Sequence, residues 1–198
     1  FIVLVLIVLV AAFNIIGMLT MMVIRKTREI GILKAMGAKS STVTRIFVLA
    51  GDNVVWQVDD IAHQLLFVHA FCKCAHLDGK NLVYFRFASH QPLVPDQYEA
   101  VVYVLNLRAG FEQFITRILN VISDYGKGAC YVFDCLSYLA EVWRSPRLLG
   151  NFFRLTCPRL LDLDTVTYFG VYRHRHDRSA IGVITATTQF LIDVFTCR

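Results

Sequence analysis

A metal–nucleotide site is the first chemistry that the residue types suggest, at Tyr131-Val-Phe-Asp134-Cys-Leu-Ser137. An apolar strand that ends on Asp is the Walker B arrangement, in which the carboxylate holds Mg²⁺ at the carboxyl edge of a sheet. Asp134 is therefore the candidate Mg–nucleotide residue. The alternative, which we favour, is a strand-end residue without catalysis, because many buried strands end on Asp.

Nucleotide chemistry also needs a loop that binds the phosphates, and the sequence contains no G-x-x-x-x-G-K-[ST] string. Gly37-Ala-Lys-Ser40 lacks the Gly-Lys pair, while Gly79-Lys-Asn and Gly126-Lys-Gly lack the hydroxyl residue. We therefore predict no catalytic residue and no resident cofactor, with Mg-ATP as the open alternative. Whether the chain is an enzyme stays open, and we favour a role without catalysis.

Two clusters could bind ligands, and for both we favour a plainer interpretation. Cys72-Lys-Cys-Ala-His76 could supply three metal ligands, but on one helix this spacing points them to different faces. We therefore predict packed thiols and no metal site. The run Arg173-His-Arg-His176 could bind a phosphate, and we favour a solvated basic loop, partly offset by Asp177.

These residues need a sheet to position them, and the pattern of residues 52–198 predicts an α/β fold. Short apolar or β-branched runs alternate with helical patterns, which favours a mostly parallel sheet with helices on both faces. Asp59 or Asp60 can cap the first helix, and Pro158 is expected to end the helical stretch before it. The expected strands are 53–58, 82–87, 101–105, 129–133 and 165–172, and the expected helices are 61–74, 111–122 and 137–156.

The first 24 residues are predicted to form a transmembrane helix. They carry no ionisable side chain, and sixteen of them are Val, Ile, Leu or Phe. At 1.5 Å per residue the helix would be roughly 36 Å long, enough to cross a hydrocarbon core of about 30 Å. The apolar residues outweigh the one central Asn14 on the insertion scale. A signal peptide would need a basic leading region and a shorter apolar stretch.

The charges beside this helix predict its orientation. Residues 25–50 hold six Lys or Arg and one Glu, which gives +5, the whole net charge of the chain. Basic residues that flank a span stay cytoplasmic, so residues 25–198 are expected on the cytoplasmic side. The basic isoelectric point thus reflects topology and does not indicate a nucleic-acid partner. In that compartment the six cysteines are expected to be free thiols.

Small and polar residues on one face of the predicted span favour contact with another permease helix. Ala11, Asn14, Gly17 and Met21 share that face. Two short cytoplasmic helices are expected after the span, at about 27–36 and 42–49, with Gly37 as a C-terminal cap. A basic helix lying on anionic lipid is the simpler alternative for this stretch.

The strings Val10-Ala-Ala-Phe-Asn-Ile-Ile, Lys26-Thr-Arg-Glu-Ile-Gly-Ile-Leu-Lys-Ala-Met-Gly-Ala38 and Arg45-Ile-Phe-Val-Leu resemble FtsX-type permeases of ABC systems. The likeness is greatest to the LolC/LolE lipoprotein-releasing subunits and their MacB-like relatives, and it covers residues 1–51. It implies the bacterial inner membrane, with residues 25–51 as a segment that couples to an ABC ATPase subunit. By this resemblance the ATPase contact would include Arg28, Glu29, Ile32, Lys34 and Met36.

A second, unrelated resemblance covers residues 52–198. Asn53-Val-Val-Trp-Gln-Val-Asp, Tyr131-Val-Phe-Asp-Cys-Leu-Ser and Thr187-Thr-Gln-Phe-Leu-Ile-Asp-Val are similar to a RecA/KaiC-like module. That module stands at the front of some proteins of the pyruvate, phosphate dikinase or phosphoenolpyruvate synthase type. The resemblance implies an incomplete RecA-like domain that lacks a phosphate-binding loop.

The two resemblances meet at Gly51-Asp52 without a linker, and the first residue is Phe instead of Met. We therefore expect a chimeric or fragmentary membrane protein, in which part of a lipoprotein-releasing or efflux-type permease joins a non-catalytic RecA-like module. The alternative function is a membrane-anchored nucleotide-sensing or regulatory module. The expected domains are 1–24, 25–51 and 52–198.

Overall fold

The computed structural model describes residues 52–194. The predicted span at 1–24 and the predicted coupling segment at 25–51 lie outside the described residues. Within the described range, none of the helices combines the length and the apolar character that crossing a membrane requires.

Strands and helices alternate along the described chain, as the sequence predicts. The 3-10 helices are η1 (Ile61–Gln64), η2 (Asp96–Tyr98) and η3 (Leu107–Ala109). The strands are β1 (Asn53–Val58), β2 (Leu82–Arg86), β3 (Val101–Val104), β4 (Cys130–Cys135), β5 (Val166–Tyr172) and β6 (Phe190–Asp193). The helices are α3 (Leu65–Leu77), α4 (Phe111–Tyr125), α5 (Ser137–Trp143), α6 (Pro146–Asp162) and α7 (Arg178–Thr187).

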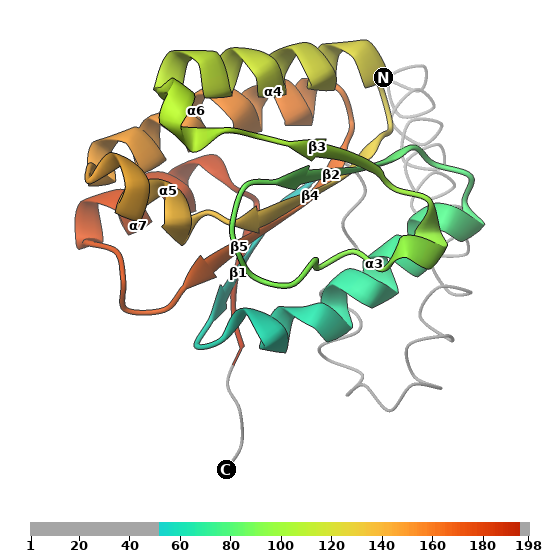
Figure 1. Ribbon diagram of the computed structural model, residues 1–198, viewed down its shortest axis with the longest axis horizontal. Helices are drawn as coiled ribbons and strands as arrows, with labels where there is room; N and C mark the ends of the chain where they lie inside the picture. The colour runs from blue at the N-terminus through green and yellow to red at the C-terminus, as the bar shows by residue number, and fades with distance from the viewer. Residues whose placement is uncertain (1–51, 195–198) are drawn as a thin grey trace, which may run out of the picture. The chain divides into compact units, whose positions relative to one another are not determined.

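The six strands form one sheet in the order β3-β2-β4-β5-β1-β6. Every pairing between them is parallel, which confirms the predicted α/β class with a parallel sheet. Figure 1 shows α3 on one face and α4, α5, α6 and α7 on the other. Parallel neighbours need crossover connections, and right-handed crossovers in opposite directions along the sheet place helices on opposite faces.

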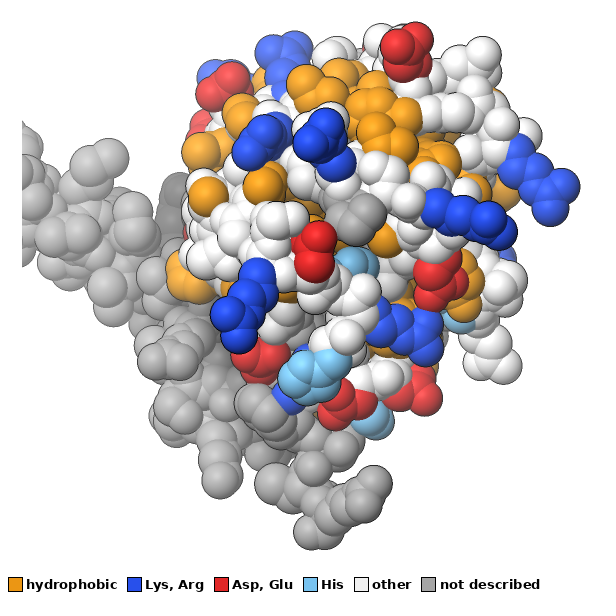
Figure 2. Space-filling model, turned by 90° about the vertical axis from the view of Figure 1, so that its left-hand side faces the viewer, with side chains coloured by type: hydrophobic (Ala, Val, Ile, Leu, Met, Phe, Trp, Pro, Cys, Tyr) orange, Lys and Arg blue, Asp and Glu red, His pale blue; other side chains and the backbone are white. Residues whose placement is uncertain are grey.

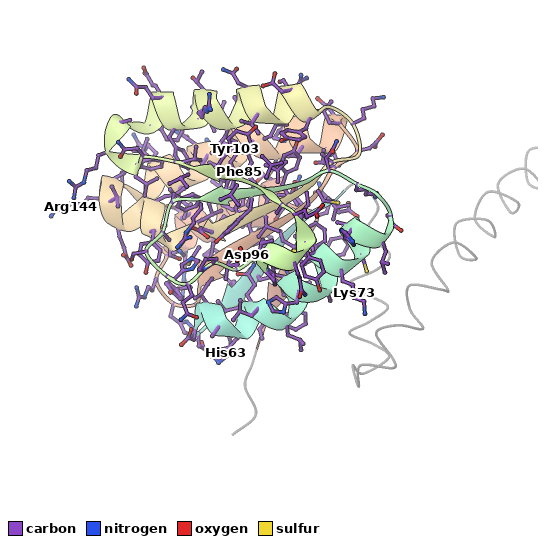
Figure 3. All side chains as sticks on the ribbon, turned by 45° about the vertical axis from the view of Figure 1, so that its right-hand side comes forward. His63, Lys73, Phe85, Asp96, Tyr103 and Arg144 are labelled. Carbon is purple, nitrogen blue, oxygen red and sulfur yellow. The ribbon has the colours of Figure 1, made fainter. Side chains whose placement is uncertain are left out.

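Aromatic side chains fill the layer between the sheet and α6. Phe133 of β4 and Phe169 of β5 lie with ring centres 4.8 Å apart, and Phe152 of α6 meets Phe133 edge-on at 5.7 Å. On the opposite face, Trp56 stacks on Phe67 of α3 at 4.3 Å. Figure 3 shows side chains filling both layers. The sheet is therefore buried on both faces, which explains why its central strands are apolar without alternation.

The helix α4 forms where the sequence repeats apolar residues at helical spacing. Its buried side chains are Phe114, Ile115, Ile118, Val121 and Ile122. It ends at Gly126, whose φ of 68° lies in the left-handed region that glycine tolerates. The spacing of the apolar residues and the glycine at the end of the helix both agree with the helix predicted at 111–122, which is confirmed.

Pro158 does not end the helical stretch, contrary to the sequence-based expectation. It lies inside α6, which runs from Pro146 to Asp162. A proline removes one N–H and frees the carbonyl of the residue four positions earlier, here Arg154. Both Pro158 and Arg154 are exposed, so water can satisfy that carbonyl. The buried residues on the other side, Thr156, Cys157 and Leu160, keep the helix packed on the sheet.

Gly170 of β5 is the position where an added methyl group should cost most. A Cβ there would lie 2.3 Å from Oε1 of Gln64 and 3.1 Å from Cδ1 of Ile61. Gln64 is fully buried and has little room to move. We expect Gly170→Ala to lower the free energy of unfolding by about 1–3 kcal/mol, measured by urea denaturation. Gly170→Ala with Gln64→Ala should recover part of that loss.

Gly150→Ala is the matched control, since its Cβ would meet Val183 at an ordinary 3.5 Å. Gly150 lies inside α6, where Ala is the better helix former, so this variant should be neutral or slightly stabilising. Equal stability of the two single variants would contradict the packing described around Gly170.

Candidate functional site at the carboxyl edge of the sheet

Parallel α/β sheets bind ligands beyond the carboxyl ends of their strands, where neighbouring connections leave toward opposite faces. Here the chain leaves β1 toward α3, whereas it leaves the adjacent β5 toward α7. Figure 2 looks at the side that carries α5 and α7, and its His side chains lie in the middle and lower part of the view, beside Asp or Glu and Lys or Arg side chains. This edge is therefore where a site should be sought.

Asp134 lies at the end of β4 and is fully buried. Its Oδ1 accepts a hydrogen bond from the Tyr84 hydroxyl. Its Oδ2 accepts from the backbone N–H groups of Phe87 at 2.8 Å and Ala88 at 2.9 Å. The His90 Nε2 lies 3.6 Å from Oδ1. Three donors and a nearby ring thus surround the carboxylate, an arrangement that suits a structural acceptor better than a ligand of Mg²⁺.

Tyr84 joins this carboxylate to the loop that follows β2. Its hydroxyl accepts the N–H of Leu93 at 3.1 Å while donating to Asp134. Burial raises the pKa of Tyr84 far above its usual range, and the negative charge of Asp134 raises it further. The phenol therefore stays protonated and keeps donating.

The loop after β1 stands where a strand–loop–helix unit would place bound phosphates. Its Asp60 caps η1, with Oδ1 accepting the N–H of Ala62 at 2.9 Å, so the capping prediction is confirmed for Asp60. Asp59 pairs with Arg173, Oδ1 to Nε, at 3.3 Å. Arg173 Nε also lies 3.9 Å from Oδ1 of Asp193 at the end of β6. The two carboxylates of this loop, those of Asp59 and Asp60, would repel a phosphate group.

Part of the basic run after β5 is tied to the protein, while His174 and Arg175 are exposed, as expected for a solvated loop. Ser137 Oγ accepts the N–H of Tyr172 at 2.8 Å and lies 2.7 Å from Nε2 of His176. Burial lowers the pKa of His176 and favours its neutral ring, so this bond joins the hydroxyl to a neutral imidazole. Arg175 Nη1 contacts Glu141 Oε1 at 2.7 Å. Hence His176 and Arg175 serve contacts between elements.

The cysteine cluster behaves as packed thiols. Cys72 is fully buried, and burial raises the pKa of its thiol to about 12. Cys74 on the same helix is half-buried, so the two side chains point to different faces. Among the residues that the structure describes, no group of three or more His, Cys, Asp or Glu could hold a metal ion.

Sequence reasoning found Asp134 but missed Tyr84 and His90 as its neighbours at this edge. Tyr84 lies opposite Val132 in the pairing of β2 with β4, two residues before Asp134. Strand order brings these residues together, and the sequence alone does not give strand order. The predicted coupling residues Arg28, Glu29, Ile32, Lys34 and Met36 lie outside the described residues.

The burial of His176 makes stability depend on pH. Burial lowers the pKa of His176 below its usual 6.5, so the folded state favours the neutral ring and the unfolded state takes up the proton first. Stability is therefore complete above about pH 6.5 and falls as pH decreases through the folded-state pKa. We expect His176→Gln to lose less stability than the wild type between pH 7 and pH 5, measured by urea denaturation. Equal losses in both chains would show that His176 does not contribute.

Comparison with known families matches residues 1–51 to the family described as FtsX-like permease C-terminal. No curated protein matches the chain. The match supports the FtsX-type part of the sequence interpretation and with it a membrane setting of the ABC-transporter kind. The chain thus carries an FtsX-like permease segment at 1–51, and the parallel α/β domain after it has no family assignment.

Proposed function

We propose that this chain is a permease-derived membrane anchor with an ATPase-coupling segment, joined to a RecA-like module that does not process nucleotide. Residues 1–24 would span the membrane, residues 25–51 would dock on an ABC ATPase subunit, and residues 52–198 would form the module. In this proposal the permease part is of the lipoprotein-releasing or efflux type. One helix of a permease can anchor and dock, and by itself it cannot transport.

The anchor is supported by the family match over residues 1–51 and by their composition. The first 24 residues carry no ionisable side chain and are mostly apolar, and all the net charge lies in residues 25–50. A basic flank of this kind favours the cytoplasmic side, where an ATPase subunit would be available. Glu29 is the one acidic residue among six basic residues in this segment, so reversing its charge is a specific test of the contact with the ATPase.

The RecA-like character is supported by strand order. One strand, β5, separates β1 from β4, so the loop after β1 and the end of β4 lie two strands apart at the carboxyl edge. By the resemblance to a RecA-like module, a phosphate loop would follow the first of these strands and a Walker B acid would end the second, at the same edge of the sheet. The same two positions here hold Asp59-Asp60 and Asp134.

The lack of nucleotide processing is carried by one observation: the carboxylate of Asp134 already accepts three hydrogen bonds inside the protein. The loop after β1 supports the same conclusion, because Asp60 caps η1 where a phosphate would need free N–H groups. In addition, the sequence contains no phosphate-loop lysine to offset the charge of ATP.

The coupling segment is tested by co-purification. We expect the tagged chain, co-expressed with the ATPase subunit of an FtsX-type transporter, to retain that subunit on an affinity column. Glu29→Lys should reduce the retained ATPase at least roughly tenfold, since it removes the one acid of the segment. Glu112→Lys, a charge reversal on the exposed side of α4, is the control and should retain the ATPase. Failure of the wild type to retain any ATPase would exclude this role.

The second candidate function is a membrane-anchored nucleotide sensor, which the Asp134 position favours. If our first proposal is right, Mg-ATP will not bind to the wild type in calorimetry. Asp134→Asn should then lower the free energy of unfolding by about 1–3 kcal/mol, because a neutral amide has one acceptor oxygen in place of the two that now accept from Tyr84 and from the backbone N–H groups. Tyr84→Phe, which removes one donor, should be destabilising in the same range. Micromolar Mg-ATP binding that Asp134→Asn abolishes without unfolding the chain would instead establish the sensor.

A further inference from the structure

The edge strand β3 exposes apolar side chains on both faces of the sheet. Val101, Val102 and Val104 have exposed fractions of 45%, 50% and 78%. Within the described residues β3 pairs with β2 and with no other strand. Such an edge offers a row of backbone donors and acceptors to another chain.

The direction of these backbone groups can be derived from one hydrogen bond. The N–H of Leu105 donates to the carbonyl of Arg86 at 2.7 Å, so Leu105 turns its backbone groups toward β2. Because the direction alternates along a strand, Tyr103 and Val101 also face β2. Val102 and Val104 therefore direct their N–H and C=O groups away from the sheet.

Protein edges are commonly protected by Lys, Pro or an inward-pointing charge, and β3 has none of these along Val-Val-Tyr-Val. The strand is also held firmly on its inner side. Tyr103 contacts Phe85 at 5.9 Å between ring centres, and the Arg117 guanidinium of α4 lies 5.7 Å from the centre of the Tyr103 ring. Figure 3 shows Tyr103 and Phe85 lying beneath α4. A rigid, uncharged edge loses little entropy when it pairs.

The charges that flank β3 indicate what pairs with it. The exposed acids Asp96 and Glu99 precede the strand, and the exposed Arg108 follows it. If a second copy pairs in the antiparallel direction, the acidic end of each strand meets the basic end of the other. A partner strand of the same sequence in the parallel direction would bring like charges together.

We propose that β3 is a self-association edge, where two copies of the chain join their sheets through antiparallel β3 strands. A two-fold axis perpendicular to the sheet keeps α4 on the same face in both copies. With the axis at Tyr103, Val102 of one copy lies opposite Val104 of the other. These are the residues whose backbone groups point outward, so each such pair exchanges two hydrogen bonds.

This register also covers the exposed apolar surface. The side chains of Val102 and Val104 share one face of the sheet and pack across the axis. On the other face the two Tyr103 residues become a directly opposed pair without hydrogen bonds between them, with Cα atoms about 4.5 Å apart. That separation lies within the range of about 4.4–6.8 Å that a disulfide can bridge.

The proposal is tested on the full chain in lipid nanodiscs or mild detergent, by light scattering and by cross-linking. We expect the wild type to be dimeric and Tyr103→Cys to form a disulfide-linked dimer on oxidation. Val104→Pro removes an outward N–H without touching the pairing with β2, and it should weaken the dimer at least roughly tenfold. Val104→Lys should act in the same direction, because it places a charge on each side of the axis.

Val142→Lys is the matched control, since Val142 of α5 is an exposed valine away from β3, and it should leave the dimer unchanged. Arg108→Glu should weaken the dimer, and Arg108→Glu with Glu99→Lys should restore it. A monomeric wild type, or a dimer that neither Val104→Pro nor Val104→Lys weakens, would overturn the proposal. Cross-linking of Tyr103→Cys to another protein instead of a second copy would overturn it as well.

Discussion

The buried carboxylate of Asp134 is the interaction on which the carboxyl edge depends. Taking an ionised carboxylate out of water is costly unless its lone pairs are satisfied. Tyr84 and the N–H groups of Phe87 and Ala88 satisfy them, and a hydrogen bond to a charged acceptor is stronger than a neutral one. Since these donors come from β2 and the loop after it, one side chain of β4 holds that loop against the end of the sheet.

Further polar contacts fix the neighbouring strands in the same way. Arg173 after β5 reaches both Asp59 after β1 and Asp193 at the end of β6. Ser137 after β4 holds the backbone of Tyr172 at the end of β5. These bonds connect segments that are distant in the chain and adjacent in the sheet. They also use the polar groups at this edge for internal contacts, which is why we interpret the edge as structural.

The sequence predicted those features that depend on local patterns. The helix α4 could be predicted from the spacing of its apolar residues, and the cap at Asp60 from the residue type, because both depend on neighbours along the chain. Pro158 was misjudged, since its tolerance depends on an exposed Arg154 carbonyl that only the packed helix reveals. Tyr84 and His90 could not be assigned to Asp134, because strand order brings them together across 50 and 44 residues of chain. Sequence patterns locate strands and leave their order open.

The location of charge connects the two parts of this chain. Residues 25–50 hold the whole net charge, so the remainder has no net charge to attract a partner at long range. Association of such a domain must depend on local complementarity, and β3 combines outward backbone groups, exposed valines and charges of opposite sign at its two ends. Two copies joined there would carry two permease segments. Pairing of copies would then give the α/β domain a role that requires no nucleotide.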